Sequence, residues 1–182
     1  MPLEDYTDDD TITNADLLYR RVYYTPAWVT YDVARKRLRP TRAAFNNTKR
    51  REDGAETYLS VFIKSTLDQM QLQPASVIDS PAALVSISVA RFRTKAVEKN
   101  VPQQIIRRPL EPPPSGNPAH GGIGGKKTGS IQNELAEHAR WVIPLPQEWV
   151  ADNRKNIHLP EDMDIEENWN ELFKDCGCDD HS

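Results

Sequence analysis

The segment 120–130, HGGIGGKKTGS, combines residue types that bind phosphate. Its glycines leave backbone N–H groups accessible, and its lysines add positive charge. A helix is expected to begin at Ser130, and the N-terminus of a helix attracts anions. The alternative is a flexible loop whose lysines are merely solvated. The predicted phosphate-binding residues are Gly124, Gly125, Lys126, Lys127, Thr128 and Ser130, with His120 at the entrance of the loop.

The spacing within this segment excludes a P-loop NTPase. That motif requires G-x-x-x-x-G-K followed by Ser or Thr, between a strand and a helix. Here Lys127 occupies the position of the hydroxyl residue, and a proline-rich segment precedes the glycines. We therefore expect a weaker anion site rather than an NTPase.

A second potential binding surface is the basic segment 35–51, RKRLRPTRAAFNNTKRR. Its cations attract phosphates, and Trp28, Tyr31 and Phe45 offer surfaces on which bases can stack. No zinc-finger spacing, RNP1 pattern or helix-turn-helix pattern accompanies it. A solvated surface, partly neutralised by the acidic ends of the chain, is the alternative. The predicted nucleic-acid-binding residues are Arg35, Lys36, Arg37, Arg39, Arg42, Lys49, Arg50 and Arg51.

The acidic segment after residue 160 carries apolar residues on one helical face. The residues expected to dock on a partner are Ile165, Trp169, Leu172 and Phe173, spaced i, i+4, i+7 and i+8. Such a helix fits the groove of a partner protein; equally, it can fold back on its own domain. Cys176, Cys178 and His181 follow, but three ligands at a chain end make a poor metal site. We predict no metal and no cofactor.

Charge is strongly partitioned along the 182-residue chain, whose net charge is −4. Residues 1–16 carry six acidic and no basic side chains, and residues 161–182 carry nine acidic and one basic. The region between them has a net charge of +10. We expect this basic core to recognise a phosphate-bearing partner, either nucleic acid or a nucleotide. The acidic C-terminal helix would dock a partner protein or mask the core; a pure protein-interaction subunit is a further alternative.

Three short sequences occur in a suggestive order: LLYRRV (17–22), YLSVF (58–62) and NELAEHA (133–139). Together they resemble the Arg, Ser, Glu order of ADP-ribosyltransferase-like domains, which use NAD. The resemblance implies that Arg20 or Arg21 binds the phosphates of NAD and that Ser60 shapes the nicotinamide pocket. It also implies that Glu134 or Glu137 stabilises the oxocarbenium-like centre. Spacing alone indicates no Ser–His–Asp or Cys–His arrangement, so we favour binding over catalysis.

The elements that position these residues are predicted from propensity and periodicity. Strands are expected where β-branched and aromatic residues gather, at 16–24, 57–63, 83–93 and 103–108, with a short edge strand in 141–146. Helices are expected at 65–74, capped by Ser65, and at 130–142, capped by Ser130. Residues 27–55 are interpreted as irregular and residues 109–129 as a long loop, rich in proline and then in glycine.

These elements predict an α+β fold with a mainly antiparallel sheet of about 4–5 strands and 2–3 helices. We expect a disordered acidic tail at 1–16, a single basic domain at 17–150, and an acidic tail with a short amphipathic helix at 151–182. No apolar segment approaches the ~20 residues of a membrane span. The acidic N-terminus is unlike a secretory signal, so we expect a cytoplasmic protein without a membrane partner.

Overall fold

The computed structural model describes residues 6–47, 58–78, 80–109 and 117–175, and it has the predicted α+β fold with a mainly antiparallel sheet. The larger sheet has six strands in the order β6-β7-β4-β1-β5-β8, and β2 and β3 form a separate two-stranded sheet. The sheet is therefore larger than the sequence predicts. The strands are β1 (Leu17–Tyr23), β2 (Val29–Asp32), β3 (Arg37–Pro40), β4 (Leu59–Ile63), β5 (Ala82–Ser88), β6 (Gln104–Arg107), β7 (His120–Gly124) and β8 (Arg140–Ile143).

Strand β1 lies inside the sheet, and its side chains alternate between two apolar cores. Leu18 and Val22 lie in the larger core, whereas Tyr19 lies in the smaller one beside Phe62 and Leu84. Successive side chains of a strand point to opposite faces, so the alternation follows directly from the sequence of β1. The sheet therefore buries apolar side chains on both faces.

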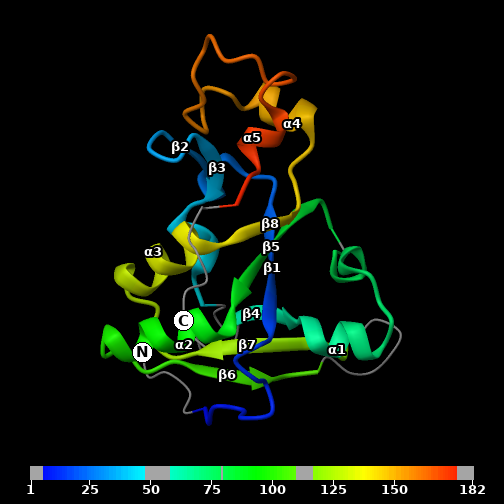
Figure 1. Ribbon diagram of the computed structural model, residues 1–182, viewed down its shortest axis with the longest axis vertical. Helices are drawn as coiled ribbons and strands as arrows, with labels where there is room; N and C mark the ends of the chain where they lie inside the picture. Colours follow the sequence, from blue (N-terminus) through cyan, green and yellow to red (C-terminus); the bar gives the residue numbers. More distant parts are fainter. Residues whose placement is uncertain (1–5, 48–57, 79, 110–116, 176–182) are drawn as a thin grey trace, which may run out of the picture.

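The two neighbours of β1 pair with it to different extents. β5 forms a ladder of register pairs along the whole of β1, from Leu17↔Ser88 to Tyr23↔Ala82. β4 pairs with β1 only at Leu18↔Ile63 and Tyr19↔Phe62. Beyond those pairs the strands diverge: β1 follows the long axis of the molecule, while β6 and β7 run across it (Figure 1). The divergence leaves a gap between β1 and β4 beyond Tyr19 and Phe62.

The helices are short. They are α1 (Lys64–Gln69), α2 (Val89–Glu98), α3 (Gly129–His138), α4 (Gln147–Asp152) and α5 (Trp169–Leu172), with 3₁₀ turns η1 (Pro26–Trp28), η2 (Arg42–Phe45) and η3 (Pro74–Val77). Helix α5 packs on β3 of the two-stranded sheet. Within the described ranges, no helix is long and apolar enough to cross a membrane.

The strand predicted at 83–93 ends early, and the prediction was wrong for its second half. β5 stops at Ser88, whose hydroxyl accepts a hydrogen bond from the Arg91 backbone N–H and so caps α2. Val89, Phe92 and Ala96 are the buried residues of this helix. Their spacing is that of a helix. The alternation of β5 continues past Ser88 into the first residues of α2, so the sequence pattern does not show where the helix begins.

Both predicted helix caps differ from the caps that form. Ser65 lies inside α1, and its hydroxyl donates to the carboxylate of Asp16. α3 begins at Gly129 rather than after Ser130, because the Thr128 hydroxyl accepts from the Ile131 backbone N–H. Thr and Ser both cap helices well, so composition alone does not select between neighbouring hydroxyl residues.

Segment 27–55, interpreted as irregular, contains the β2–β3 hairpin. The two strands pair from Val29↔Pro40 to Asp32↔Arg37. The hairpin turn includes Lys36, which has a φ of 51°. A turn residue with positive φ is usually Gly or Asn. Residues 33–36 contain neither, so the sequence gives no signal for this hairpin turn.

The glycine-rich part of the predicted loop 109–129 is the buried strand β7. A Cβ atom added at Gly122 would lie 2.4 Å from the Tyr58 ring, so the glycine lets this ring lie against the strand. Gly125 ends the strand with a φ of 95°, a conformation that suits glycine. These glycines therefore serve close packing and a turn, which corrects the expectation of a flexible loop.

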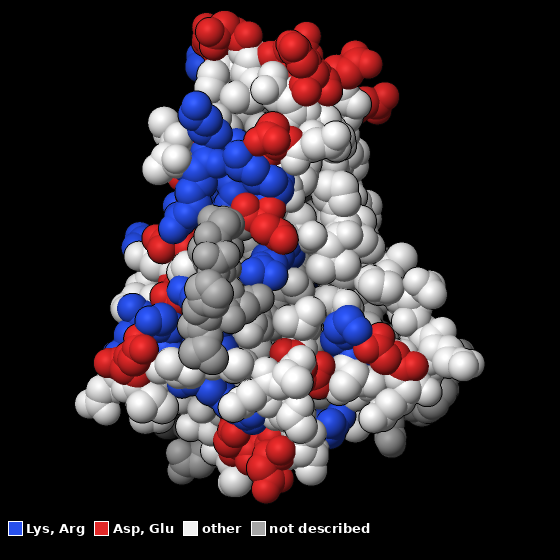
Figure 2. All heavy atoms as spheres, in the orientation of Figure 1, with Lys and Arg blue, Asp and Glu red and all other residues white. Residues whose placement is uncertain are grey.

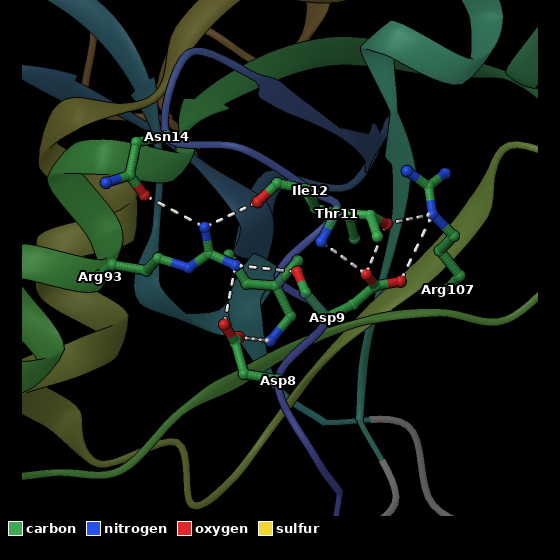
Figure 3. A network of polar contacts seen from close by, with 8 residues as sticks. Asp8, Asp9, Thr11, Ile12, Asn14, Arg93 and Arg107 are labelled. Atoms are coloured by element: carbon green, nitrogen blue, oxygen red, sulfur yellow. Dashed lines mark hydrogen bonds and ion pairs between the residues drawn. The ribbon is translucent and has the colours of Figure 1, made fainter.

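The described part of the expected disordered N-terminal tail, residues 6–16, is packed against the fold. The Ile12 side chain is fully buried. Arg93 of α2 donates to the Asp8 carboxylate (2.7 Å) and to the Ile12 carbonyl oxygen (2.7 Å), and Arg107 of β6 contacts Asp9 (3.4 Å) (Figure 3). Asp8 and Asp9 of this segment are thus partners of arginines in the fold.

The described part of the expected C-terminal tail also belongs to the fold. Ile157, Leu159, Ile165 and Leu172 are buried in the larger core. The regular helix of this segment, α5, has four residues. The apolar residues that suggested a separate tail helix are therefore contributing to the core of the same domain.

Candidate functional site

A cleft opens where β1 and β4 diverge, and we call it the β1–β4 cleft. Its volume is about 530 Å³, within the range of sites for small ligands. Strands β1, β4 and β7 supply part of its lining, and the rest comes from η1, from η2 and the two residues after it, and from the residue before β4. The lining residues are Arg20, Arg21, Tyr23, Trp28, Ala43, Asn46, Asn47, Tyr58, Ser60 and His120.

Arg20 lies in the gap between the diverging strands and is 9% exposed. Its Nε donates to the Ala44 carbonyl oxygen (3.1 Å) and its Nη1 to the Ser60 carbonyl oxygen (2.9 Å). Burial lowers the pKa of Arg20 to about 10, so the guanidinium stays charged at neutral pH. Within the described residues, its Nη2 has no hydrogen-bond acceptor. This amino group is available to a ligand in the cleft.

Aromatic rings form the walls around Arg20. The guanidinium carbon of Arg20 lies 5.5 Å from the centroid of the Trp28 ring, a cation–π distance. Tyr23 packs on Trp28 with ring centroids 5.3 Å apart. Tyr58, placed by its contact with Gly122, lies 5.9 Å from the His120 ring. The cleft thus offers flat apolar surfaces beside a cation.

Ser60 and His120 form a hydrogen-bonded pair in the same cleft. Ser60 Oγ lies 2.8 Å from His120 Nε2, and His120 Nδ1 lies 2.6 Å from the Arg108 carbonyl oxygen. A carbonyl oxygen only accepts, so Nδ1 carries the proton of the neutral ring and Nε2 accepts from the serine hydroxyl. Burial is the main cause that lowers the pKa of His120, and the charges of Arg21 and Arg108 lower it further. The ring is therefore neutral at pH 7.

The charged groups of the cleft are cationic. Arg21 stacks near Phe62, with its guanidinium carbon 5.2 Å from the ring centroid. Among the lining residues that the structure describes, none is Asp or Glu. Arginine charge in a cleft with apolar walls attracts anions, because field lines are focused there.

The residues of the ADP-ribosyltransferase resemblance separate into two groups. Arg20, Arg21 and Ser60 line the β1–β4 cleft. Glu134 lies elsewhere, on α3, where it pairs with Arg91 (3.1 Å). Glu137 is also on α3 and is absent from the described lining of the cleft. The expected carboxylate is thus not brought to the arginines and the serine.

The residues of the predicted phosphate loop lie in different environments. Lys127 turns back on the chain, and its Nζ donates to the carbonyl oxygens of Ile123 (2.9 Å) and Gly125 (2.9 Å). Lys126 is exposed. His120 lies at the opposite end of β7 and faces the β1–β4 cleft. Of the residues predicted for the loop, the structure therefore places His120 in a different site. The remaining members, Gly124, Thr128 and Ser130, lie at the end of β7 and the start of α3.

The basic segment 35–51 is divided among different environments. Arg37 is fully buried, and its guanidinium donates to the Glu137 (2.7 Å) and Ala139 (3.4 Å) carbonyl oxygens. Arg35 and Arg39 each contact the Asp32 carboxylate at 3.3 Å, whereas Lys36 and Arg42 are exposed. Figure 2 shows blue side chains gathered over the β2–β3 hairpin, below an acidic region. Lys49, Arg50 and Arg51 lie outside the described residues.

The residues predicted to dock on a partner contact their own domain. Ile165 and Leu172 are core residues, and Trp169 and Phe173 pack against that core. The Phe173 ring also lies 5.4 Å from that of Trp141 on β8. The part of the chain that the structure describes contains no group of acidic, His or Cys side chains able to hold a metal. Cys176, Cys178 and His181 fall outside it.

The pairing of Ser60 with His120 was missed at the level of sequence. The period of two in β4 places Ser60 on the same face as Phe62, which the sequence indicates. The register of β4 against β7, which brings His120 diagonally opposite Ser60, has no local signal. The sequence predicts Trp28 only as a stacking surface for nucleic acid, and no local pattern marks Tyr58.

Comparisons give no independent indication of function. No protein-family model, curated protein or solved structure matches this chain.

Proposed function

We propose that this protein binds the phosphate of a nucleotide in the β1–β4 cleft. The observation that carries the proposal is Arg20, a buried cation whose hydrogen-bonded partners are two main-chain carbonyl oxygens. Burying a charge without a carboxylate is unfavourable, and an anionic ligand would offset that penalty. Guanidinium also matches the geometry of phosphate oxygens.

The aromatic walls favour a nucleotide over a simple phosphate. Trp28 and Tyr58 both line the cleft, and a base can stack on either ring. A volume of about 530 Å³ accommodates a mononucleotide or part of a dinucleotide.

Nucleic acid is a weaker candidate than a nucleotide. Arg37 is unavailable because it is buried, and the charges of Arg35 and Arg39 are partly neutralised by Asp32. The packing of Ile165 and Leu172 likewise supports the alternative in which the acidic segment covers its own domain instead of docking on a partner.

The test is a calorimetric titration of the full chain with AMP, ADP and NAD. We expect one site, and we expect Arg20→Lys to weaken binding about 10-fold, because lysine lacks the planar fork of donors. Arg42→Lys is the matched control, since Arg42 is exposed and outside the cleft lining. Equal affinity of the Arg20→Lys variant and the wild type would reject the proposal.

An NAD-using transferase is a second candidate, supported by the presence of Arg20, Arg21 and Ser60 in one cleft. Its carboxylate would not come from Glu134 or Glu137, which lie on α3 away from the described lining. Release of nicotinamide from NAD, lost on Arg20→Lys and retained on Glu134→Gln, would support this function. A wild type that releases no nicotinamide from NAD, or an Arg20→Lys variant that releases it at the wild-type rate, would contradict it.

A further inference from the structure

Three groups with complementary chemistry meet in the β1–β4 cleft: the Ser60 hydroxyl, the His120 imidazole and the Arg20 guanidinium. Ser60 is paired with Gly122, and Phe62 with His120, so Ser60 and His120 are diagonal neighbours on adjacent strands. Arg20 Nη1 donates to the carbonyl oxygen of Ser60 itself (2.9 Å). Arg20 and Ser60 both line the cleft, so a phosphate held by the Nη2 of Arg20 would share this cleft with the Ser60 hydroxyl.

The hydrogen bonds of His120 orient it as a base toward Ser60. Nδ1–H donates to the Arg108 carbonyl oxygen, which leaves the lone pair of Nε2 directed at Ser60 Oγ, 2.8 Å away. A hydroxyl within this distance of a neutral imidazole nitrogen can lose its proton as it attacks an electrophile. The pair alone would also suit a structural cross-strand contact, but it lies in the lining of the cleft.

We propose that Ser60 is a nucleophile that attacks the phosphorus of the nucleotide held by Arg20, with His120 as the general base. The protein then hydrolyses a phosphoester or phosphoanhydride bond of that nucleotide. This inference rests on the proposed function, because the nucleotide must place its phosphate at Arg20. It goes beyond binding in naming a reaction and the residues that perform it.

The reaction balances with water as the co-reactant. Ser60 Oγ forms a bond to phosphorus while the bond from phosphorus to the leaving oxygen breaks. The Ser60 proton passes to His120 Nε2 and then to the leaving oxygen. Water next attacks the phosphoserine and gives a proton to His120, and the released Ser60 oxygen takes that proton back. Charge that develops on the phosphoryl oxygens is stabilised by the guanidinium of Arg20.

The groups that surround His120 set the pH dependence of this reaction. Arg21 comes from β1, Arg108 from the segment after β6, and Tyr58 and Phe62 pack on the ring from the β4 side. Burial lowers the pKa of His120 most strongly and the charges of both arginines lower it further, whereas the hydrogen bond to the Arg108 carbonyl oxygen raises it without reversing the shift. Ser60 reactivity should therefore be complete at neutral pH and fall only below the ordinary histidine range, as His120 becomes protonated.

The first test is labelling of the full chain with a fluorophosphonate, a reagent that phosphonylates activated serines. We expect a single adduct by intact mass, mapped to Ser60 by peptide analysis, and no adduct in Ser60→Ala. Ser130→Ala, which changes an exposed serine, is the control and should label normally. An adduct of equal yield in Ser60→Ala would overturn the proposal, as would an unlabelled wild type.

The second test measures phosphate release from ADP and AMP. His120→Gln should lower turnover and labelling at least about 100-fold, the usual contribution of a general base. His138→Gln is the matched control, because His138 is a half-buried histidine on α3, outside the described cleft lining. If His120→Gln unfolds, the pH profile of wild-type labelling provides the same test without a variant. A rate that rises as pH falls below 6 would exclude His120 as the base.

The two proposals fail in different ways. Nucleotide binding without Ser60 labelling or phosphate release would leave the binding function standing and reject the nucleophile. Ser60 labelling without nucleotide binding would reject the nucleotide as the ligand, and with it the assigned reaction, while retaining an activated serine.

Discussion

Two arginines, Arg20 and Arg37, are buried in different regions of this molecule and have similar hydrogen-bond partners. Each donates to two main-chain carbonyl oxygens, and burial lowers the pKa of each to about 10. They differ in what surrounds the rest of the guanidinium. Arg37 is 0% exposed and joins β3 to the end of α3, whereas Arg20 lines the β1–β4 cleft.

The difference shows that burial of a cation alone does not indicate function. For Arg37 the carbonyl oxygens of Glu137 and Ala139 gain a donor, and two distant parts of the chain are held together. For Arg20 the carbonyl contacts orient the side chain but leave Nη2 without an acceptor among the described residues. We therefore expect Arg37 to contribute to folding and Arg20 to contribute to ligand binding.

The largest expected effect is on stability, for Arg37→Ala. The substitution removes donors from two carbonyl oxygens and leaves a cavity, which should lower the free energy of unfolding by about 3 kcal/mol. Urea denaturation measures the change. Nucleotide affinity of the folded variant should equal that of the wild type. A loss of stability below about 1 kcal/mol would contradict a structural role for Arg37.

Arg20→Met should have the opposite effects to Arg37→Ala, with a large loss of ADP affinity and a small loss of stability. The variant loses hydrogen bonds from a charged donor to phosphate, so its affinity for ADP should fall about 30-fold, or about 2 kcal/mol. Its stability should fall less than that of Arg37→Ala, because removal of the buried charge partly compensates for the lost carbonyl contacts. Titration calorimetry and urea denaturation on one preparation separate the two quantities. If Arg20→Met and Arg37→Ala changed ADP affinity and stability by the same amounts, the assignment of different roles to the two arginines would be contradicted.

Gly122→Ala tests the wall of the cleft without touching either arginine. The added Cβ would lie 2.4 Å from the Tyr58 ring, which must move away from β7. We expect a loss of stability of about 1–2 kcal/mol, typical of overpacking, and weaker ADP binding. Unchanged binding, despite the displaced ring, would exclude Tyr58 as part of the ligand site.

The smallest expected effect concerns Asp9, a carboxylate near the surface that contacts Arg107. A hydrogen bond from Thr11 is the largest cause that lowers the pKa of Asp9, and Arg107 and Arg93 lower it further. Because the folded pKa lies below the unfolded one, this stabilisation is present above the unfolded value. It is lost as pH falls through the lowered folded pKa.

Asp9→Asn should therefore reduce stability by less than about 1 kcal/mol at pH 7 and flatten its decline below about pH 4. Urea denaturation at several pH values measures both changes. An unaltered pH profile in Asp9→Asn would show that the Asp9 contacts in Figure 3 contribute nothing to folding.

Local sequence patterns predicted some elements because their side chains alone determine them. The strands at 17–23 and 59–63 follow from propensity. Arg20, Arg21 and Ser60 were indicated by the resemblance to ADP-ribosyltransferase-like domains rather than by a local pattern, and all three line the β1–β4 cleft. Their meeting with His120 depends on the register of β4 against β7, a long-range contact without a local signal. The glycines of 120–130 were predicted to form a loop for the same reason. Gly122 is required by the Tyr58 ring that packs on it, and this contact between distant residues has no local signal either.

The most direct test of the account is a crystal structure of the full chain with bound ADP. We predict that a phosphate group lies within hydrogen-bond distance of Arg20 Nη2 and that the adenine contacts Trp28 or Tyr58. ADP bound instead at Lys126 and the start of α3, or along the β2–β3 hairpin, would contradict the assignment of the β1–β4 cleft as the nucleotide site.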